Sequence, residues 1–331
     1  MDEYGFRPRR PDAAAELSNT DQFVDTTNPP GDSEALLRHM LAVSEASCGP
    51  DHPEVARALN NLATLLQTTN RFSEAEPLMR RALAIDEAAF GPNHPVVATI
   101  LGNLAQLLKA TNRLAEAEPF MRRAIAINEA SFPENHLETA IQLNNLAMLL
   151  HAMNRFSEAE PLMRRSLAIS EVNFGPNHPE IATRLSNLAG VLQAMNRHSE
   201  AEPLIRQALA IDEANDEPQH TRVAVRLINL AQLLQDTNRL SEAEPLIRRA
   251  IAIHESLYLV TRQVHEDQRI AVASYLSLLD EMGVTGHEAD ERVISALREG
   301  KHAPSLSPNP RAEEKLNRAT RRRLAAQQRH R

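Results

Sequence analysis

The sequence contains no tryptophan and a single cysteine, Cys48, among its 331 residues. One cysteine excludes an intramolecular disulfide and a thiolate metal cluster, and it favours a reducing compartment. Aromatic residues make up only 3% of the chain, whereas apolar residues make up 42%. The core must therefore consist mainly of Leu, Ile, Met and Ala, a composition that favours helices over strands.

Long apolar runs are also missing. No stretch approaches the roughly 18 consecutive apolar residues of a membrane-spanning helix, and the first residues contain no apolar segment of signal-peptide length. A formal net charge of -8 argues against nucleic acid as the partner of the chain as a whole. We therefore expect a soluble, cytoplasmic protein with no membrane partner.

The motifs of common catalytic sites are absent as well. The sequence has no phosphate-binding loop of the form GxxxxGK[ST], no GxGxxG, no HExxH and no GxSxG. We expect a protein that is not an enzyme, with no catalytic residues, no cofactor and no metal ion.

What the sequence does contain is one unit of 42 residues in five copies. Three features recur at this spacing: the dipeptide Asn-Arg, the triplet Asn-Leu-Ala and the triplet Ala-Glu-Pro. The Asn-Arg copies begin at Asn70, Asn112, Asn154, Asn196 and Asn238. A fixed period of this length is typical of repeat architectures, in which each copy is one supersecondary unit.

Each unit reads as two amphipathic helices. Leu59, Leu62 and Leu66 recur at helical spacing in the first half of a unit, and Met79 and Ala82 do so in the second half. The sequence predicts an all-α solenoid of about six stacked antiparallel helix pairs. Its full repeats are expected at 53–90, 95–132, 137–174, 179–215 and 221–258.

The ends of the array differ from its middle. Residues 1–32 are expected to form a disordered or degenerate segment. In it, Thr26-Thr27-Asn28 aligns with Thr68-Thr69-Asn70, which indicates a worn repeat unit. The second helix of that unit is expected at about 33–47. A divergent C-terminal pair is expected at 264–299, so the solenoid spans 33–299. Residues 300–331 read as a flexible linker followed by a basic tail.

Local signals mark the helix ends. Pro95 suits the first position of a helix, and Gly91 suits the left-handed residue that closes the preceding helix. Ser73 and Glu76 form a capping-box pattern before the second helix. Pro77 lies inside that helix, where it predicts either a slight bend or a later start.

The apolar stripes of the two helices in each unit match the tetratricopeptide repeat consensus, in which a small residue such as Ala63 packs against small residues of the second helix. With the 42-residue period and phrases such as NRFSEAEPLMRRALAI, the chain resembles the kinesin-light-chain-like subtype of that family. It lacks the long heptad segment of a kinesin light chain, so the resemblance is to proteins of the kind found in bacterial genomes. The resemblance implies a scaffold for protein–protein interaction.

The family resemblance also implies a peptide-binding groove along the first helices. The groove candidates are polar side chains of those helices: Asn60, Asn61, Thr64, Gln67, Asn103, Gln106, Lys109, Asn144, Asn145, His151, Ser186, Asn187, Gln193, Asn229, Gln232 and Gln235. Amides and hydroxyls suit recognition of an extended peptide backbone, because each side chain both donates and accepts. The alternative for the repeated asparagines is that they tie adjacent units together through their own backbone.

A histidine also recurs once per unit, at His52, His94, His136, His178 and His220. Zinc needs all of its ligands within about 2.3 Å of one ion, and side chains one helix pair apart do not meet this condition. We therefore interpret these histidines as residues of helix starts and loops.

The basic tail provides a second candidate function. Arg318, Arg321, Arg322 and Arg323 lie in a stretch without acidic residues, which favours contact with nucleic acid or an acidic partner surface. Other interpretations are a solvated tail or one that folds back on the acidic repeats. A third possible function is the sensor or regulatory arm of a signalling complex.

Overall fold

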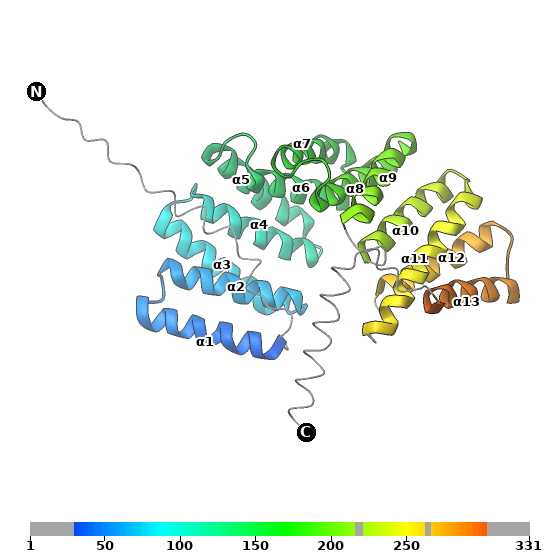
Figure 1. Cartoon of the computed structure of the whole chain (residues 1–331). Coiled ribbons are helices and arrows are strands. Elements are labelled where there is room, and N and C mark those ends of the chain that lie inside the picture. The colour runs from blue at the N-terminus through cyan, green and yellow to red at the C-terminus, as the bar shows by residue number, and fades with distance from the viewer. Residues whose placement is uncertain (1–29, 216–220, 262–265, 303–331) are drawn as a thin grey trace, which may run out of the picture. The chain divides into compact units, whose positions relative to one another are not determined.

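The computed structural model describes residues 30–215, 221–261 and 266–302, and within them the chain forms thirteen α-helices and no strand (Figure 1). The helices divide into two compact units, residues 1–132 and 133–331. In each unit, consecutive helices pack against one another as pairs. The all-α fold of stacked helix pairs with a 42-residue period is confirmed.

The first unit contains α1 and two full pairs. Their bounds are Pro30–Cys48 (α1), Pro53–Thr68 (α2), Phe72–Phe90 (α3), Pro95–Ala110 (α4) and Leu114–Ser131 (α5). The second unit contains three full pairs and two divergent helices. Their bounds are Leu137–Ala152 (α6), Phe156–Phe174 (α7), Pro179–Ala194 (α8), His198–Asn215 (α9), Thr221–Asp236 (α10), Leu240–Thr261 (α11), Glu266–Glu281 (α12) and His287–His302 (α13).

The Asn-Arg dipeptide forms the tight turn between the helices of a pair. Asn70 adopts a left-handed backbone with φ of 59°, as do its four copies. The Arg71 N–H then donates to the Leu66 carbonyl at 2.9 Å, and the Asn70 N–H donates to the Gln67 carbonyl at 3.0 Å. This left-handed cap satisfies carbonyls that the end of α2 leaves unpaired, and it turns the chain back within three residues. The helices of each pair are therefore antiparallel.

The apolar stripes meet inside each pair. Leu59, Ala63 and Met79 are completely buried, and the same holds for their counterparts in the next pair. Small residues such as Ala75 and Ala82, also fully buried, allow the two helices to approach closely. The core of each unit is thus a continuous layer of Leu, Ala, Ile and Met.

The predicted capping box is wrong. α3 begins at Phe72 with Arg71 as its N-cap residue, so Ser73 already lies inside the first turn and no side chain caps the helix. The left-handed turn at Asn70 sets this early start. The later start considered for Pro77 is therefore also wrong. The carbonyl of Ser73, which the missing proline N–H leaves without its helical donor, belongs to an exposed residue of the first turn.

The arginine of each turn joins neighbouring second helices. Arg113 contacts Glu76 of the preceding repeat at 2.6 Å and Glu116 of its own helix at 2.6 Å. Arg71, Arg197 and Arg239 make the same pair of contacts with their own neighbours. Although burial opposes it, hydrogen bonding from Arg113 and Arg80 holds the pKa of Glu76 below its usual range. This row of ion pairs lines the outer edge of the second helices.

A second contact between repeats is buried, and its chemistry changes from copy to copy. In the second unit, Asp212 of α9 is fully buried and accepts a hydrogen bond from Arg226 of α10 at 2.9 Å. The corresponding positions in the first unit are Asp86 of α3 and Ile100 of α4. Asp86 is only 3% exposed and has no arginine opposite it, so burial raises the pKa of its carboxyl to about 6.

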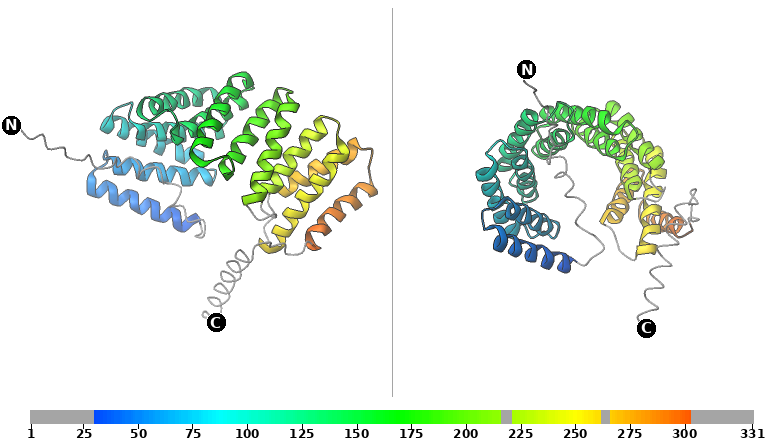
Figure 2. Two further views of the ribbon diagram at one scale, coloured as in Figure 1. Left: turned by 45° about the horizontal axis from the view of Figure 1, so that its top comes forward. Right: turned by 60° about the vertical axis from the view of Figure 1, so that its left-hand side comes forward.

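The C-terminal pair departs from the pattern. α13 packs mainly against α11 rather than against α12, its neighbour in sequence (Figure 2, orange beside yellow). Gly300 permits this contact, because a Cβ atom there would lie 2.5 Å from the Ala252 carbonyl oxygen and 2.8 Å from the Cβ of Glu255. The longer connection after α12, with left-handed Gly283 and Gly286, lets α13 reach that position.

We predict that Gly300→Ala lowers the free energy of unfolding by about 1 to 3 kcal/mol, because the added methyl group overlaps the α11 backbone. Gly190→Ala is the matched control, since a Cβ there meets no atom within 4 Å. Alanine is the better helix former, so the control should gain up to about 1 kcal/mol. Urea unfolding of both variants measures the difference, and equal effects would contradict the close packing of α13.

A second prediction concerns the buried aspartate. Because burial raises the pKa of Asp86 above its unfolded value, its stabilising protonated form is present at acid pH and is lost as the pH rises through about 6. Asp86→Asn should therefore stabilise the protein by up to about 3 kcal/mol at pH 8 and have little effect at pH 4.5.

The matched control for this prediction is Asp212→Asn, which should destabilise by about 3 to 5 kcal/mol at pH 8, because it leaves Arg226 buried without its carboxylate. Urea unfolding at both pH values tests the two variants. The interpretation fails if both substitutions change stability in the same direction.

Candidate functional site

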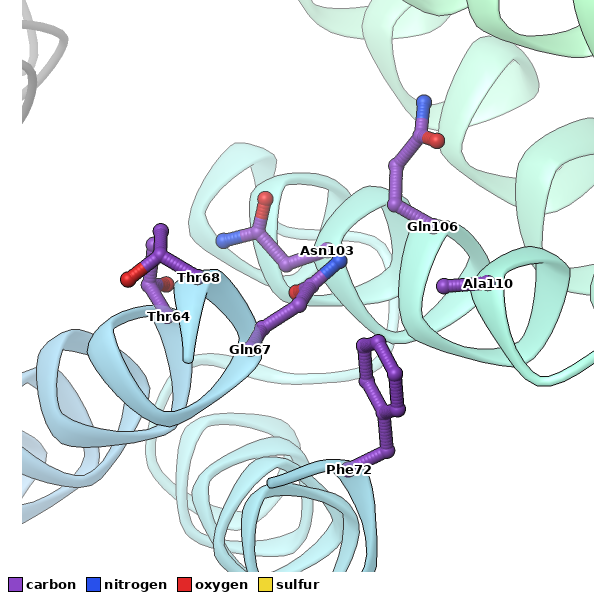
Figure 3. Close-up of a pocket in the computed structure, with 7 residues that line it drawn as sticks. All are labelled: Thr64, Gln67, Thr68, Phe72, Asn103, Gln106 and Ala110. Atoms are coloured by element: carbon purple, nitrogen blue, oxygen red, sulfur yellow. The ribbon is translucent and has the colours of Figure 1, made fainter. Parts of the chain in front are cut away.

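A pocket of about 460 Å³ opens between α2 and α4 in the first unit. Figure 3 shows its two walls, with Phe72 at the start of α3 between them. The residues that line it are Thr64, Gln67, Thr68, Phe72, Asn103, Gln106 and Ala110. The first helices supply the walls because their apolar stripes face the second helices and leave the opposite polar side exposed.

The lining of the pocket is uncharged, and only some of its hydrogen-bonding side chains have a partner. No charged side chain lies in it, and four of its members, Thr64, Gln67, Asn103 and Gln106, are predicted groove residues. The amides of Gln67 and Gln106 have no hydrogen-bond partner in the described part of the chain, whereas the Thr64 hydroxyl donates to the Asn60 carbonyl at 2.9 Å. The Phe72 ring and the Ala110 methyl add an apolar surface. The pocket therefore offers both hydrogen-bonding amides and an apolar contact.

The repeated asparagines tie neighbouring first helices together. Asn103 of α4 donates from Nδ2 to Oδ1 of Asn60 in α2 at 3.0 Å, and Asn187 of α8 does the same to Asn144 in α6 at 3.0 Å. In α10, Asn229 donates to the Ser186 hydroxyl at 3.3 Å. The tie thus runs between side chains and not through the asparagine's own backbone. Asn61 and Asn145 are half-buried at the same position of α2 and α6.

The other predicted groove residues lie on the first helices but are not all equally available. Gln235 is largely buried and donates to Glu281 and, at 3.4 Å, to Ser277, both in α12. Gln232 donates to Asp236 at 3.2 Å, and the His151 ring packs edge-on against Phe156. Burial lowers the pKa of the Lys109 ammonium, and Gln193 is half-buried. A role of any of these residues in binding stays a prediction.

The histidines that recur once per unit are helix caps. The His94 Nδ1 accepts a hydrogen bond from the Val96 N–H at 3.3 Å, and His52, His136 and His178 cap α2, α6 and α8 in the same way. The last residue of the preceding helix stacks its ring on two of them, Phe90 on His94 at 4.8 Å and Phe174 on His178 at 4.5 Å between centroids. Their interpretation as residues of helix starts is confirmed for these four, and His220 lies outside the described residues.

Sequence reasoning missed Phe72, Thr68 and Ala110. Phe72 follows the Asn-Arg dipeptide directly, so its position could be found from the sequence. The direction of its side chain, however, depends on the early start of α3. Thr68 and Ala110 occupy the same position at the ends of α2 and α4, and their small side chains leave the space that the pocket fills.

Three further expectations concern other chemistry. The Arg318, Arg321, Arg322 and Arg323 cluster lies outside the described residues. Among the residues that the structure describes, no three His, Cys, Asp or Glu side chains are grouped as a metal site would require. None of the described helices combines the length and apolar composition that crossing a bilayer demands.

We predict that Asn103→Ala destabilises the protein by about 1 kcal/mol, because the half-buried Asn60 oxygen loses its donor. Gln106→Ala, in the same helix and the same pocket, breaks no hydrogen bond and should change stability by less than about 0.5 kcal/mol. Thermal unfolding of both variants tests this, with Asn60→Ala and the Asn60→Ala/Asn103→Ala double mutant to complete a cycle. The absence of coupling between Asn60 and Asn103 would disprove the tie.

Comparison with known proteins agrees with the fold of stacked helix pairs. The family model for the tetratricopeptide repeat matches residues 30–88, 74–130, 137–214 and 185–256. Among solved structures, the nearly identical TPR-like repeats of a Podosopora anserina protein described as a kinesin light chain are similar, with 24% identity and a TM-score of 0.56 over 64% of this chain and 99% of that one.

Two further structures share the fold. BtubC (BKLC) from P. vanneervenii is 22% identical with a TM-score of 0.60 and covers 70% of this chain and 92% of its own length. The apo form of RapI is 17% identical with a TM-score of 0.60, covering 83% of this chain and 94% of that one. No relative matches among the curated proteins. Because the family model covers most of the repeat array, the chain belongs to the tetratricopeptide repeat family.

Proposed function

We propose that this protein is a non-catalytic scaffold that binds an extended segment of a partner protein along its first helices, with the pocket between α2 and α4 as one binding position. The observation that carries the proposal is the pair of amides of Gln67 and Gln106, which have no partner among the described residues and lie beside the apolar surface of Phe72. The family membership supports a role in protein–protein interaction in general terms.

The chemistry of the pocket fits a peptide backbone. An extended peptide presents N–H and C=O groups without partners, and a glutamine side chain both donates and accepts. Since Gln67 and Gln106 make no side-chain hydrogen bond to any residue that the structure describes, binding does not require them to break a contact with those residues. The side chains of Asn60 and Asn103, in contrast, already bond to each other, so they hold the two walls at a fixed spacing.

The pocket also indicates which residue of the peptide it accepts. All of its lining side chains are uncharged, and its apolar part is formed by Phe72 and Ala110. A charged peptide side chain would lose hydration there without gaining a counter-charge. We infer that an uncharged, apolar or aromatic side chain of the partner enters the pocket.

A peptide library displayed on phage and selected against the full chain supplies a probe for this test. In fluorescence polarisation, the Gln67→Ala/Gln106→Ala variant should bind a selected peptide at least about tenfold more weakly, the loss expected for two hydrogen bonds. Gln207→Ala, on the exposed side of the second helix α9, is the matched control and should bind like wild type. Unchanged affinity in the double variant would overturn the proposed position.

The arginine cluster near the C-terminus favours a second candidate function, contact with nucleic acid or an acidic partner. The structure indicates where the chain can be shortened to remove the arginine cluster, because the last described helix, α13, ends at His302. A chain that ends there should lose salt-sensitive binding to a fluorescent oligonucleotide if the tail carries this function. Equal binding by both chains would exclude the tail.

A further inference from the structure

The helix α1 carries an apolar face that no described helix covers. Leu36, Met40 and Val43 lie on one side of α1 and are 59%, 46% and 49% exposed. They are the main concentration of exposed large apolar side chains in the described part of the first unit, and large apolar residues grouped on one face of a helix mark a packing surface.

The next repeat shows what normally covers this face. The residues 42 positions after Met40 and Val43 are Ala82 and Ile85 of α3, which are 0% and 5% exposed. They are buried because the first helix of their own pair, α2, packs on them through Val55, Ala56 and Leu59. In type and position α1 is a second helix, and its turn glutamate Glu34 pairs with Arg71 as Glu76 pairs with Arg113.

The sequence before α1 contains the counterpart of α2. Residues 11–28 align without a gap on residues 53–70, at the same 42-residue spacing as the other copies. The identical positions are Pro11, Ala14, Leu17, Asn19, Thr26, Thr27 and Asn28. This set includes the proline that starts a first helix, a leucine of the apolar stripe, the asparagine of the inter-repeat tie and the left-handed asparagine of the turn.

We propose that residues 11–26 of the same chain dock as a helix on the exposed face of α1 and complete an N-terminal repeat. In the shared register, Ala13, Ala14 and Leu17 correspond to Val55, Ala56 and Leu59, the residues that cover Ala82 and Ile85. Residues 27–29 then correspond to the three-residue turn 69–71. Because so short a connection holds the segment beside α1, its effective concentration exceeds that of a separate molecule.

Two positions make this docking weaker than in the other repeats. Thr20 and Asp21 correspond to Leu62 and Ala63, which are completely or almost completely buried. A carboxylate at the latter position opposes burial, so the segment detaches more readily than α2 does from α3. The apolar face of α1 is therefore covered by a removable helix, and a second copy of the chain is its competitor.

Amide hydrogen exchange of the full chain tests the proposal with two variants. Each introduces an aspartate into the segment, one at a position that aligns with a buried residue of α2 and one at a position that aligns with an exposed residue. Leu17 corresponds to the buried Leu59 and Ala15 to the exposed Arg57. Leu17→Asp should accelerate exchange of the α1 amides about tenfold, the change expected when one buried leucine is lost, whereas Ala15→Asp should leave exchange like that of wild type. Circular dichroism of both variants verifies that the remaining helices stay folded.

Light scattering separates the occupant proposed here from a second copy. A monomer whose α1 exchange responds to Leu17→Asp and to Met40→Asp but not to Ala15→Asp supports the intramolecular helix. Equal exchange in the two segment variants overturns it, and so does a dimer that dissociates with Met40→Asp and is unaffected by Leu17→Asp. Peptide binding between α2 and α4 is measured separately, so failure of one proposal does not depend on the other.

Discussion

Each helix pair in this protein buries its apolar stripe only if a neighbouring pair packs against it. Ala82 and Ile85 are sheltered by α2, and Ile100 of the following repeat completes the same cluster. A single pair would leave much of this surface in water, so stability arises between repeats as much as within them. The contacts that join repeats thus determine what the rest of the surface is available to do.

These contacts fall into three rows with different chemistry. The arginines of the turns pair with glutamates on the exposed edge of the second helices, where solvent screens ion pairs and each contributes little alone. The asparagines join the first helices through neutral hydrogen bonds. The buried contact between Asp212 and Arg226 is specific to its position, because the other copies carry a different combination there, such as Asp86 with Ile100 or Ser170 with Arg184. This variation distinguishes otherwise similar repeats and favours pairing in the correct order.

The division of polar residues into ties and unpaired groups defines the candidate site. Asn60 and Asn103 are engaged with each other, which holds α2 and α4 together, while Gln67 and Gln106 remain available at the pocket. A neutral pocket exerts little long-range steering on a partner, so recognition rests on short-range hydrogen bonding and on the apolar contact with Phe72. The two ends of the array differ in this respect, since Gly300 allows α13 to cover α11, whereas α1 exposes the face that the corresponding helix α3 buries.

The sequence by itself determined the repeat, the helix pairs and the turn at Asn70, because period, apolar spacing and a left-handed asparagine are local properties of the chain. It also predicted the polar residues of the first helices, since a stripe that faces the core leaves the remaining side exposed. Tertiary structure alone decided that Arg71 rather than Ser73 precedes α3, that Asn103 bonds to Asn60, and that α13 packs on α11. The start of α3 depends on how the turn at Asn70 joins it to α2, and the other two depend on distances between residues of different helices, which the spacing along one helix does not contain.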